Sequence, residues 1–221
     1  MSFGQNVVRA GKRWAILLGW GVLALGPANV QADEAAPPET ITRVEEDWLL
    51  WVGQPADAIF SPQFHTVMSP FGNMEAYYFQ VTWNYLELPD FTSGGFQVQS
   101  WNGEDHLENQ DVYSSELSRT AEIITWTQVL ETNGQQIGFS VMDGVSSSWG
   151  TFGHPETTII HDGSISNLNG YRPDVSVGNS WITYGQNRVA ILKIKAVRYY
   201  GAHGLIRTDS TSRVVYQFTG H

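Results

Sequence analysis

The sequence predicts an all-β protein built as a two-sheet antiparallel β-sandwich, and three observations support this class. Aromatic residues make up 13% of the 221 residues, charged residues only 15%, and there are 22 glycines. Aromatic residues favour strands and glycines favour tight turns. Strand-like segments recur along the chain, whereas no helical stripe exceeds about two turns and no strand–helix–strand alternation is found. We therefore expect about ten short strands, connected as a jelly roll.

Two other all-β architectures are alternatives to the sandwich. A β-propeller requires blade repeats, and the sequence has none. A closed, lipocalin-like barrel needs no repeat and stays open as the alternative.

The first 32 residues have the pattern of a secretory signal peptide. Basic residues precede the apolar run Trp14–Gly26, and Val30 and Ala32 supply the small side chains of a cleavage site. The apolar run is shorter than the roughly 20 residues that span a bilayer, although an uncleaved N-terminal anchor is the alternative. We expect a secreted or extracytoplasmic protein, in the periplasm or at the cell surface, with no membrane insertion after cleavage.

After the signal peptide, residues 33–40 form an acidic, proline-containing leader, and residues 41–221 form one β-sandwich domain. Removal of 1–32 takes away three basic residues and no acidic one, which changes the net charge from −10 to −13. Such a charge repels nucleic acids and anionic membrane surfaces, so neither is an expected partner. The absence of cysteine excludes disulfides and thiol catalysis.

The strand series opens with Ile41–Val52 and His65–Ser69, and its strongest member is Glu75–Glu87. Residues alternate between apolar and mixed side chains along this segment, as in a strand with one buried face. The expected core face carries Tyr77, Phe79, Val81, Trp83 and Tyr85, and the reverse face carries Tyr78, Gln80, Thr82 and Asn84.

The next strand, Phe96–Trp101, ends at the turn dipeptide Asn102-Gly103. Glu122–Glu131 and Gln136–Asp143 then flank Asn133-Gly134, the strongest short hairpin signal, because both central residues of that turn adopt positive φ. Asp143-Gly144 is expected to end the second strand. The remaining expected elements are strands at Ser147–Phe152, Thr157–His161, Ser180–Tyr184, Val189–Tyr200 and Arg213–Thr219, a loop at Asn167–Asn179, and a short helix at Ser114–Glu122.

The best candidate ligand site is the reverse face of the two middle strands. Sugars are bound by aromatic rings that pack on their C–H surfaces and by amides that take the hydroxyls. A half-buried face under a loop, or a plain solvent-facing sheet, would have the same pattern. The predicted ligand-binding residues are Tyr78, Gln80, Asn84, Gln97, Gln99 and Trp101.

Two acidic clusters could supply the carboxylate pair that cleavage of a glycosidic bond requires. Glu45 and Asp47 share one face of the first strand, and Glu104-Asp105 precedes Glu108 just after a turn. Both clusters also fit a solvated acidic surface, so no catalytic residue is assigned. Serine-hydrolase and phosphate-loop motifs are absent from the sequence.

No cofactor is assigned, and calcium is the metal that the loops suit best. His154 with Glu156, and His161 with Asp162, lack a zinc-binding spacing, and surface histidines explain them better. Calcium takes carboxylates from irregular loops without a fixed motif. The carboxylates in or beside predicted loops are Asp105, Asp111, Asp143, Asp162 and Asp174.

The segment Glu122–Gly153 resembles the central hairpins of concanavalin A-like lectin/glucanase jelly rolls. It contains a tryptophan strand, the Asn-Gly hairpin, and Ser-Ser-Ser-Trp-Gly-x-x-Gly, and Val189–Tyr200 is similar to their closing strand. The glucanase pattern Glu-x-Asp-x-x-Glu does not carry over, because the nearest run, Glu104-Asp105-x-x-Glu108, is one residue short. The mature chain also resembles uncharacterised exported bacterial proteins of a planctomycete-like type, through residues 166–171 and 175–180.

These observations predict a non-catalytic carbohydrate-binding or cell-surface recognition module, whose partner is a polysaccharide or surface glycan. The alternatives are a glycan-cleaving hydrolase or lyase on the same fold and a structural envelope protein without a small ligand. Fold resemblance alone does not decide among them.

Overall fold

The computed structural model describes residues 39–53, 64–84, 95–112, 121–173 and 189–217, and their regular structure is β throughout. These residues belong to one compact unit that starts at Pro38. None of the described residues forms a helix long and apolar enough to cross a membrane. The predicted all-β class is therefore confirmed for this part of the chain.

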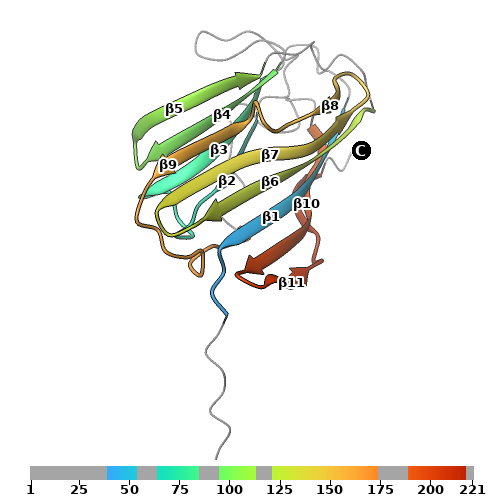
Figure 1. The fold of residues 1–221 in the computed structure, drawn as a ribbon. Coiled ribbons are helices and arrows are strands. Elements are labelled where there is room, and N and C mark those ends of the chain that lie inside the picture. Colours follow the sequence, from blue (N-terminus) through green and yellow to red (C-terminus); the bar gives the residue numbers. More distant parts are fainter. Residues whose placement is uncertain (1–38, 54–63, 85–94, 113–120, 174–188, 218–221) are drawn as a thin grey trace, which may run out of the picture. The chain divides into compact units, whose positions relative to one another are not determined.

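Eight strands form the larger of two antiparallel sheets (Figure 1). Its hydrogen-bonded order is β11-β10-β1-β6-β7-β8, with β12 also paired to β10 and β9 also paired to β7. The strands are β1 (Arg43–Val52), β6 (Ile123–Thr132), β7 (Gln136–Ser146), β8 (Gly150–Phe152), β9 (Thr158–Asp162), β10 (Val189–Gly201), β11 (Gly204–Asp209) and β12 (Arg213–Gln217).

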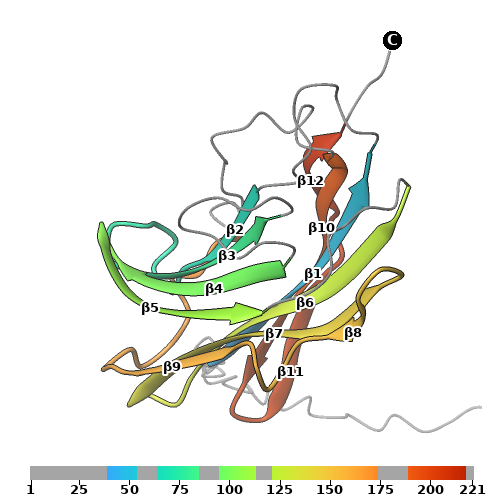
Figure 2. The same ribbon diagram turned by 90° about the horizontal axis from the view of Figure 1, so that it is seen from above.

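Four strands form the smaller sheet, in the order β2-β3-β4-β5. They are β2 (Phe64–Met68), β3 (Tyr77–Asn84), β4 (Gly95–Asn102) and β5 (Asp105–Val112). Figure 2 shows the two sheets as separate layers, and they do not close into a barrel. The arrangement is sandwich-like, and the barrel alternative is wrong.

The core-facing side chains of β3 join the two sheets, and they are the ones that the alternation in the sequence predicts. Phe79, Val81 and Trp83 are fully buried and face the large sheet. The Trp83 ring centroid lies 4.5 Å from that of Trp126 on β6 and 5.7 Å from that of Trp149. Burial of such large aromatic surfaces is the main favourable contribution to folding, so one end of the core is an aromatic cluster.

A polar layer lies beside this cluster inside the core. Glu46 of β1 is fully buried and accepts hydrogen bonds from Trp48 Nε1 (3.0 Å) and the Tyr171 hydroxyl. Its cross-strand neighbour Gln128 donates to the Thr66 hydroxyl of the small sheet. Buried polar groups are tolerated when they are hydrogen-bonded, so this layer links the two sheets at fixed positions.

Several predicted boundaries are wrong for identifiable reasons. Most of the acidic cluster Glu104–Glu108, expected just after a turn, lies in strand β5 (Asp105–Val112), and neither β5 nor β11 was predicted. β7 continues through Asp143-Gly144 to Ser146, because Asp143 takes a positive φ of 53° at a register shift of the β6–β7 pair. Both segments are stabilised by cross-strand pairing, which sequence periodicity does not capture.

The Asn133-Gly134 hairpin forms, but its turn differs from the prediction. Gly134 has a φ of 87°, whereas Asn133 is not in the positive-φ region. The Asn133 side-chain oxygen instead accepts hydrogen bonds from the backbone N–H groups of Gln135 (2.9 Å) and Gln136 (2.8 Å). An asparagine that caps its own turn in this way needs no strained backbone.

Three expectations fall wholly or largely outside the described residues. They concern the strand Ser180–Tyr184, the helix Ser114–Glu122 except for its last two residues, and the continuation of β3 over residues 85–87. Asp174, one of the calcium candidates, also lies outside them.

Candidate functional site

The outer face of the small sheet carries the residues predicted to bind a ligand. Strands β3 and β4 are antiparallel, and their register places Tyr78 opposite Trp101, Gln80 opposite Gln99, and Thr82 opposite Gln97. Neighbouring side chains on one face of an antiparallel pair are about 4.5 to 5.5 Å apart at Cβ. Five of the six predicted residues therefore lie side by side on one face of the sheet, and the side chain of the sixth, Asn84, is outside the described part.

One end of this face is aromatic. The rings of Tyr78 and Trp101 are parallel within 2°, with centroids 6.2 Å apart, and His106 of β5 lies 4.9 Å from Trp101. Tyr78 and Trp101 are both half-buried, and burial raises the pKa of the Tyr78 hydroxyl. Trp101 lies just before the turn at Gly103, whose φ is 60°. The three neighbouring rings can contact a ligand through their apolar surfaces while β3, β4 and β5 stay paired.

Next to the rings, the glutamines form a ladder of hydrogen bonds across the strands. Gln80 Nε2 donates to Gln99 Oε1 at 2.9 Å, and Gln99 donates in turn to Gln97. Gln97 Nε2 then donates to Asp111 Oδ1 at 2.6 Å. Trp101 Nε1 also points to Gln99 Oε1, at 3.3 Å. The ladder holds the side chains in one orientation and ends on a carboxylate of β5.

The ladder also limits which of these groups can meet a ligand. Gln97 and Gln99 are only 7% and 8% exposed, so their amides serve mainly to position the face. Gln80, at the start of the ladder, is half-buried and uses its amide nitrogen within the sheet. The groups best placed to touch a ligand are thus the two large rings and the carbonyl of Gln80.

Strands β2 and β5 add residues that the sequence interpretation did not place in this site. His65 of β2 accepts or donates a hydrogen bond at 2.8 Å to Thr82, and burial lowers its pKa to about 4, so its ring is neutral at pH 7. His106 and Asp111 come from β5, beyond the Asn102-Gly103 turn. That turn, between Phe96–Trp101 and an alternating polar segment, was the signal that could have identified the β4–β5 hairpin.

The carboxylate pair on the first strand is engaged by arginines. Glu45 and Asp47 share the outer face of the large sheet, as predicted, and both accept hydrogen bonds from Arg198. Burial opposes ionisation of Glu45, but hydrogen bonds from Arg198, Arg43 and Tyr200 outweigh it and lower its pKa. A general acid needs a raised pKa, so this pair is a salt-bridge network and a poor candidate for acid–base catalysis.

The second acidic cluster meets a histidine at the junction of the sheets. His161 Nε2 of β9 is 2.6 Å from the Ser100 hydroxyl and 3.8 Å from Glu108 Oε2. In a catalytic triad the acid orients the opposite ring nitrogen from the one that contacts serine. Here both groups face Nε2, and Ser100 is fully buried, so the cluster joins β9 to β4 and β5.

The carboxylates and histidines considered as metal ligands are dispersed. Asp111 and Asp162 accept hydrogen bonds from glutamines, and His154 contacts the Thr158 hydroxyl at 2.9 Å. Within the described ranges, no group of three or more histidines and carboxylates could hold a metal ion.

Neither a protein-family model nor a curated protein matches this chain. The resemblance to concanavalin A-like domains therefore stays a prediction, and function has to be inferred from the geometry of the surface.

Proposed function

We propose that this protein is an exported, non-catalytic carbohydrate-binding or cell-surface recognition module, and that its sandwich is a jelly roll of the concanavalin A type. The connectivity supports the fold. In the large sheet β1 pairs with β6 and with the late strand β10, whereas the intervening strands β2–β5 form the small sheet, so the chain crosses from one sheet to the other and back. The basic and apolar pattern of residues 1–32 supports export.

The observation that carries the binding proposal is the parallel pair of Tyr78 and Trp101 beside the Gln80–Gln99 amide pair. Flat rings offer apolar surface to sugar C–H groups, and a fixed amide carbonyl accepts a hydroxyl. The glutamine ladder holds these groups in place before a ligand arrives, which reduces the entropy lost on binding. Binding is favoured over cleavage because the candidate carboxylate pair is held by Arg198.

A glycan array with and without a chelator tests this proposal. The unmodified protein should bind a limited set of glycans, and the chelator arm shows whether calcium takes part. Trp101→Ala should weaken binding roughly 5- to 150-fold, if stacking of a ring on a sugar resembles stacking on a nucleobase at about 1 to 3 kcal/mol. Its thermal midpoint should change by only a few degrees, because Trp101 lies on the outer face.

Trp83→Ala is the matched control on the opposite face of the neighbouring strand. It should cost about 3 to 5 kcal/mol of folding free energy, as other large-to-small core changes do. Unchanged glycan binding by folded Trp101→Ala would refute the proposed site.

A further inference from the structure

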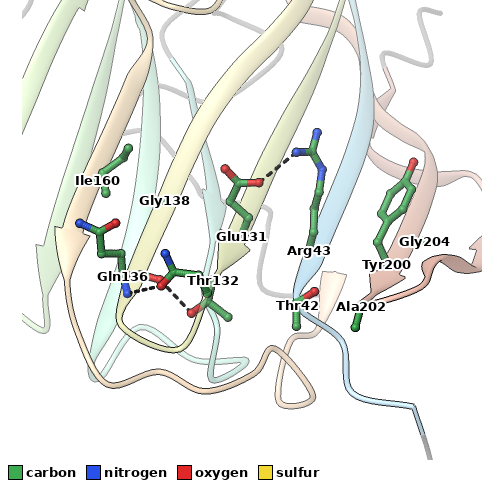
Figure 3. A pocket seen from close by; sticks show the side chains of 12 residues that line it. Thr42, Arg43, Glu131, Thr132, Gln136, Gly138, Ile160, Tyr200, Ala202 and Gly204 are labelled. Atoms are coloured by element: carbon green, nitrogen blue, oxygen red, sulfur yellow. Dashed lines mark hydrogen bonds and ion pairs between the residues drawn. The ribbon is translucent and has the colours of Figure 1, made fainter.

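A hollow lies on the outer face of the large sheet, at the end where the β6–β7 and β10–β11 hairpins turn. Its volume is about 570 Å³. Figure 3 shows Tyr200 at one side, Ile160 at the other, and Arg43 with Glu131 between them. Gly138 lies between Glu131 and Ile160 and contributes no side chain; it is buried, because atoms of these two side chains flank the position that its Cβ would take.

These five residues form a single row across the sheet. Ile160 of β9 pairs with Gly138 of β7, Gly138 with Glu131 of β6, Glu131 with Arg43 of β1, and Arg43 with Tyr200 of β10. Four strand spacings of about 4.8 Å give the row a length of about 19 Å. The hollow is therefore a groove that runs perpendicular to the strands and suits an extended ligand.

The groove is polar in the middle, where arginines and carboxylates are paired. Arg43 Nη1 donates to Glu131 Oε2 at 2.9 Å, and these side chains remain 34% and 54% exposed. The Arg43 guanidinium carbon lies 6.0 Å from the centre of the Tyr200 ring, whose hydroxyl donates to Glu45. Arg43 and Arg198 pair with three carboxylates, Glu131, Glu45 and Asp47, so negative groups outnumber positive ones by one and an anionic ligand is disfavoured.

The groove fits a saccharide better than a peptide. Peptides usually add to the free edge of a sheet through backbone hydrogen bonds. The central strands β1, β6 and β7 are paired on both sides, so their backbone groups are already used. What remains is the partly exposed Arg43 guanidinium, which pairs with Glu45 and Glu131, together with a carboxylate and an aromatic ring. Such a set recognises hydroxyl groups and C–H faces.

We infer that this groove is a second saccharide site, for a neutral oligosaccharide chain, with Arg43 and Glu131 on hydroxyl groups and the Tyr200 ring on a sugar face. The inference takes its ligand class from the proposed function. The two sites lie on the outward faces of the two sheets, with the core between them. One molecule would therefore bridge two glycan chains, and multivalent binding of this kind raises overall avidity.

Two variants of the groove test the inference in the full chain. Tyr200→Ala removes the ring and should weaken binding at the groove about 5- to 150-fold, by the same stacking estimate. Gly138→Val instead inserts a side chain between Glu131 and Ile160, whose atoms would lie 3.6 and 3.7 Å from the added Cβ, which is ordinary contact. Because valine also suits a strand, this variant should fold normally and lose the groove site. Thermal unfolding checks that both variants are folded.

The probes are a printed array of neutral, acidic and amino glycans, and the best neutral oligosaccharide from it. Calorimetric titration with that oligosaccharide should give two sites for the unmodified protein and one for Gly138→Val, Tyr200→Ala or Trp101→Ala. The same oligosaccharide coupled to a soluble polymer should be cross-linked, with a rise in turbidity, only by the unmodified protein.

The outcomes separate the two proposals. One site in the unmodified protein, lost in Trp101→Ala and retained in both groove variants, would overturn the groove and leave the first site standing. One site that is lost in the groove variants and retained in Trp101→Ala would support the groove and overturn the first site. Absence of any array signal would overturn both.

Discussion

Replacement of Trp83 or Trp48 by phenylalanine should affect stability very differently, although both indoles are fully buried. Trp48 Nε1 donates to Glu46 Oε2 at 3.0 Å. Trp83 Nε1 is buried and has no hydrogen-bond partner among the described residues. The two substitutions remove the same atoms, so the loss of apolar burial is similar, and the main difference is the hydrogen bond.

The structure sets the size of the difference. Trp48→Phe removes one hydrogen-bond donor from the buried Glu46 carboxylate, which costs about 1 to 3 kcal/mol, and more if the group is charged. Trp83→Phe removes a donor that was already unsatisfied, so it relieves a penalty of a similar size. We expect Trp48→Phe to be less stable than Trp83→Phe by at least about 2 kcal/mol.

Urea unfolding followed by far-UV circular dichroism measures this difference. Equal m-values in the two variants would show that the midpoints report stability. Trp126→Phe provides a second test, because Trp126 Nε1 is also buried without a described partner, and it should behave like Trp83→Phe. If both Trp83→Phe and Trp48→Phe lost the same free energy within about 0.5 kcal/mol, the reasoning from the unsatisfied donor would be refuted.

Two further predictions concern the β7–β8 region. Burial opposes ionisation of Glu122, but hydrogen bonds from Ser146 and Ser148 outweigh it and lower its pKa below the ordinary value of 4.5. The ionised carboxylate therefore stabilises the fold fully above pH 4.5, and this contribution is lost as the pH falls through the lowered pKa. Glu122→Gln should flatten the acid limb of a plot of unfolding free energy against pH, and an unchanged limb would contradict this. Gly153→Ala should destabilise the fold more than Gly150→Ala. Both glycines have positive φ (121° and 75°), so Gly150→Ala should itself cost about 1 to 2 kcal/mol of folding free energy. At Gly153 an added Cβ would in addition lie 2.8 Å from a backbone oxygen. Thermal unfolding of the two variants compares them, and equal midpoints would show that the close contact is relieved at no cost.

The strand faces could be predicted because alternation is a local property. Phe79, Val81 and Trp83 face the core as the period of two indicates, and Tyr78 and Gln80 face outward. The turn at Asn102-Gly103 fixed the end of β4 through the positive φ of glycine. These features depend on residues adjacent in sequence, so the all-β class and the composition of the candidate face followed from the chain itself.

Tertiary structure decided everything that depends on partners distant in sequence. The sequence left open whether Gln97 and Gln99 point to solvent, and pairing with Gln80 and Asp111 buries both amides in a ladder. The groove through Arg43, Glu131 and Tyr200 joins residues up to 157 positions apart, because β1 pairs with β6 on one side and β10 on the other. No local pattern encodes that pairing, since strand register is set by the summed packing of both faces.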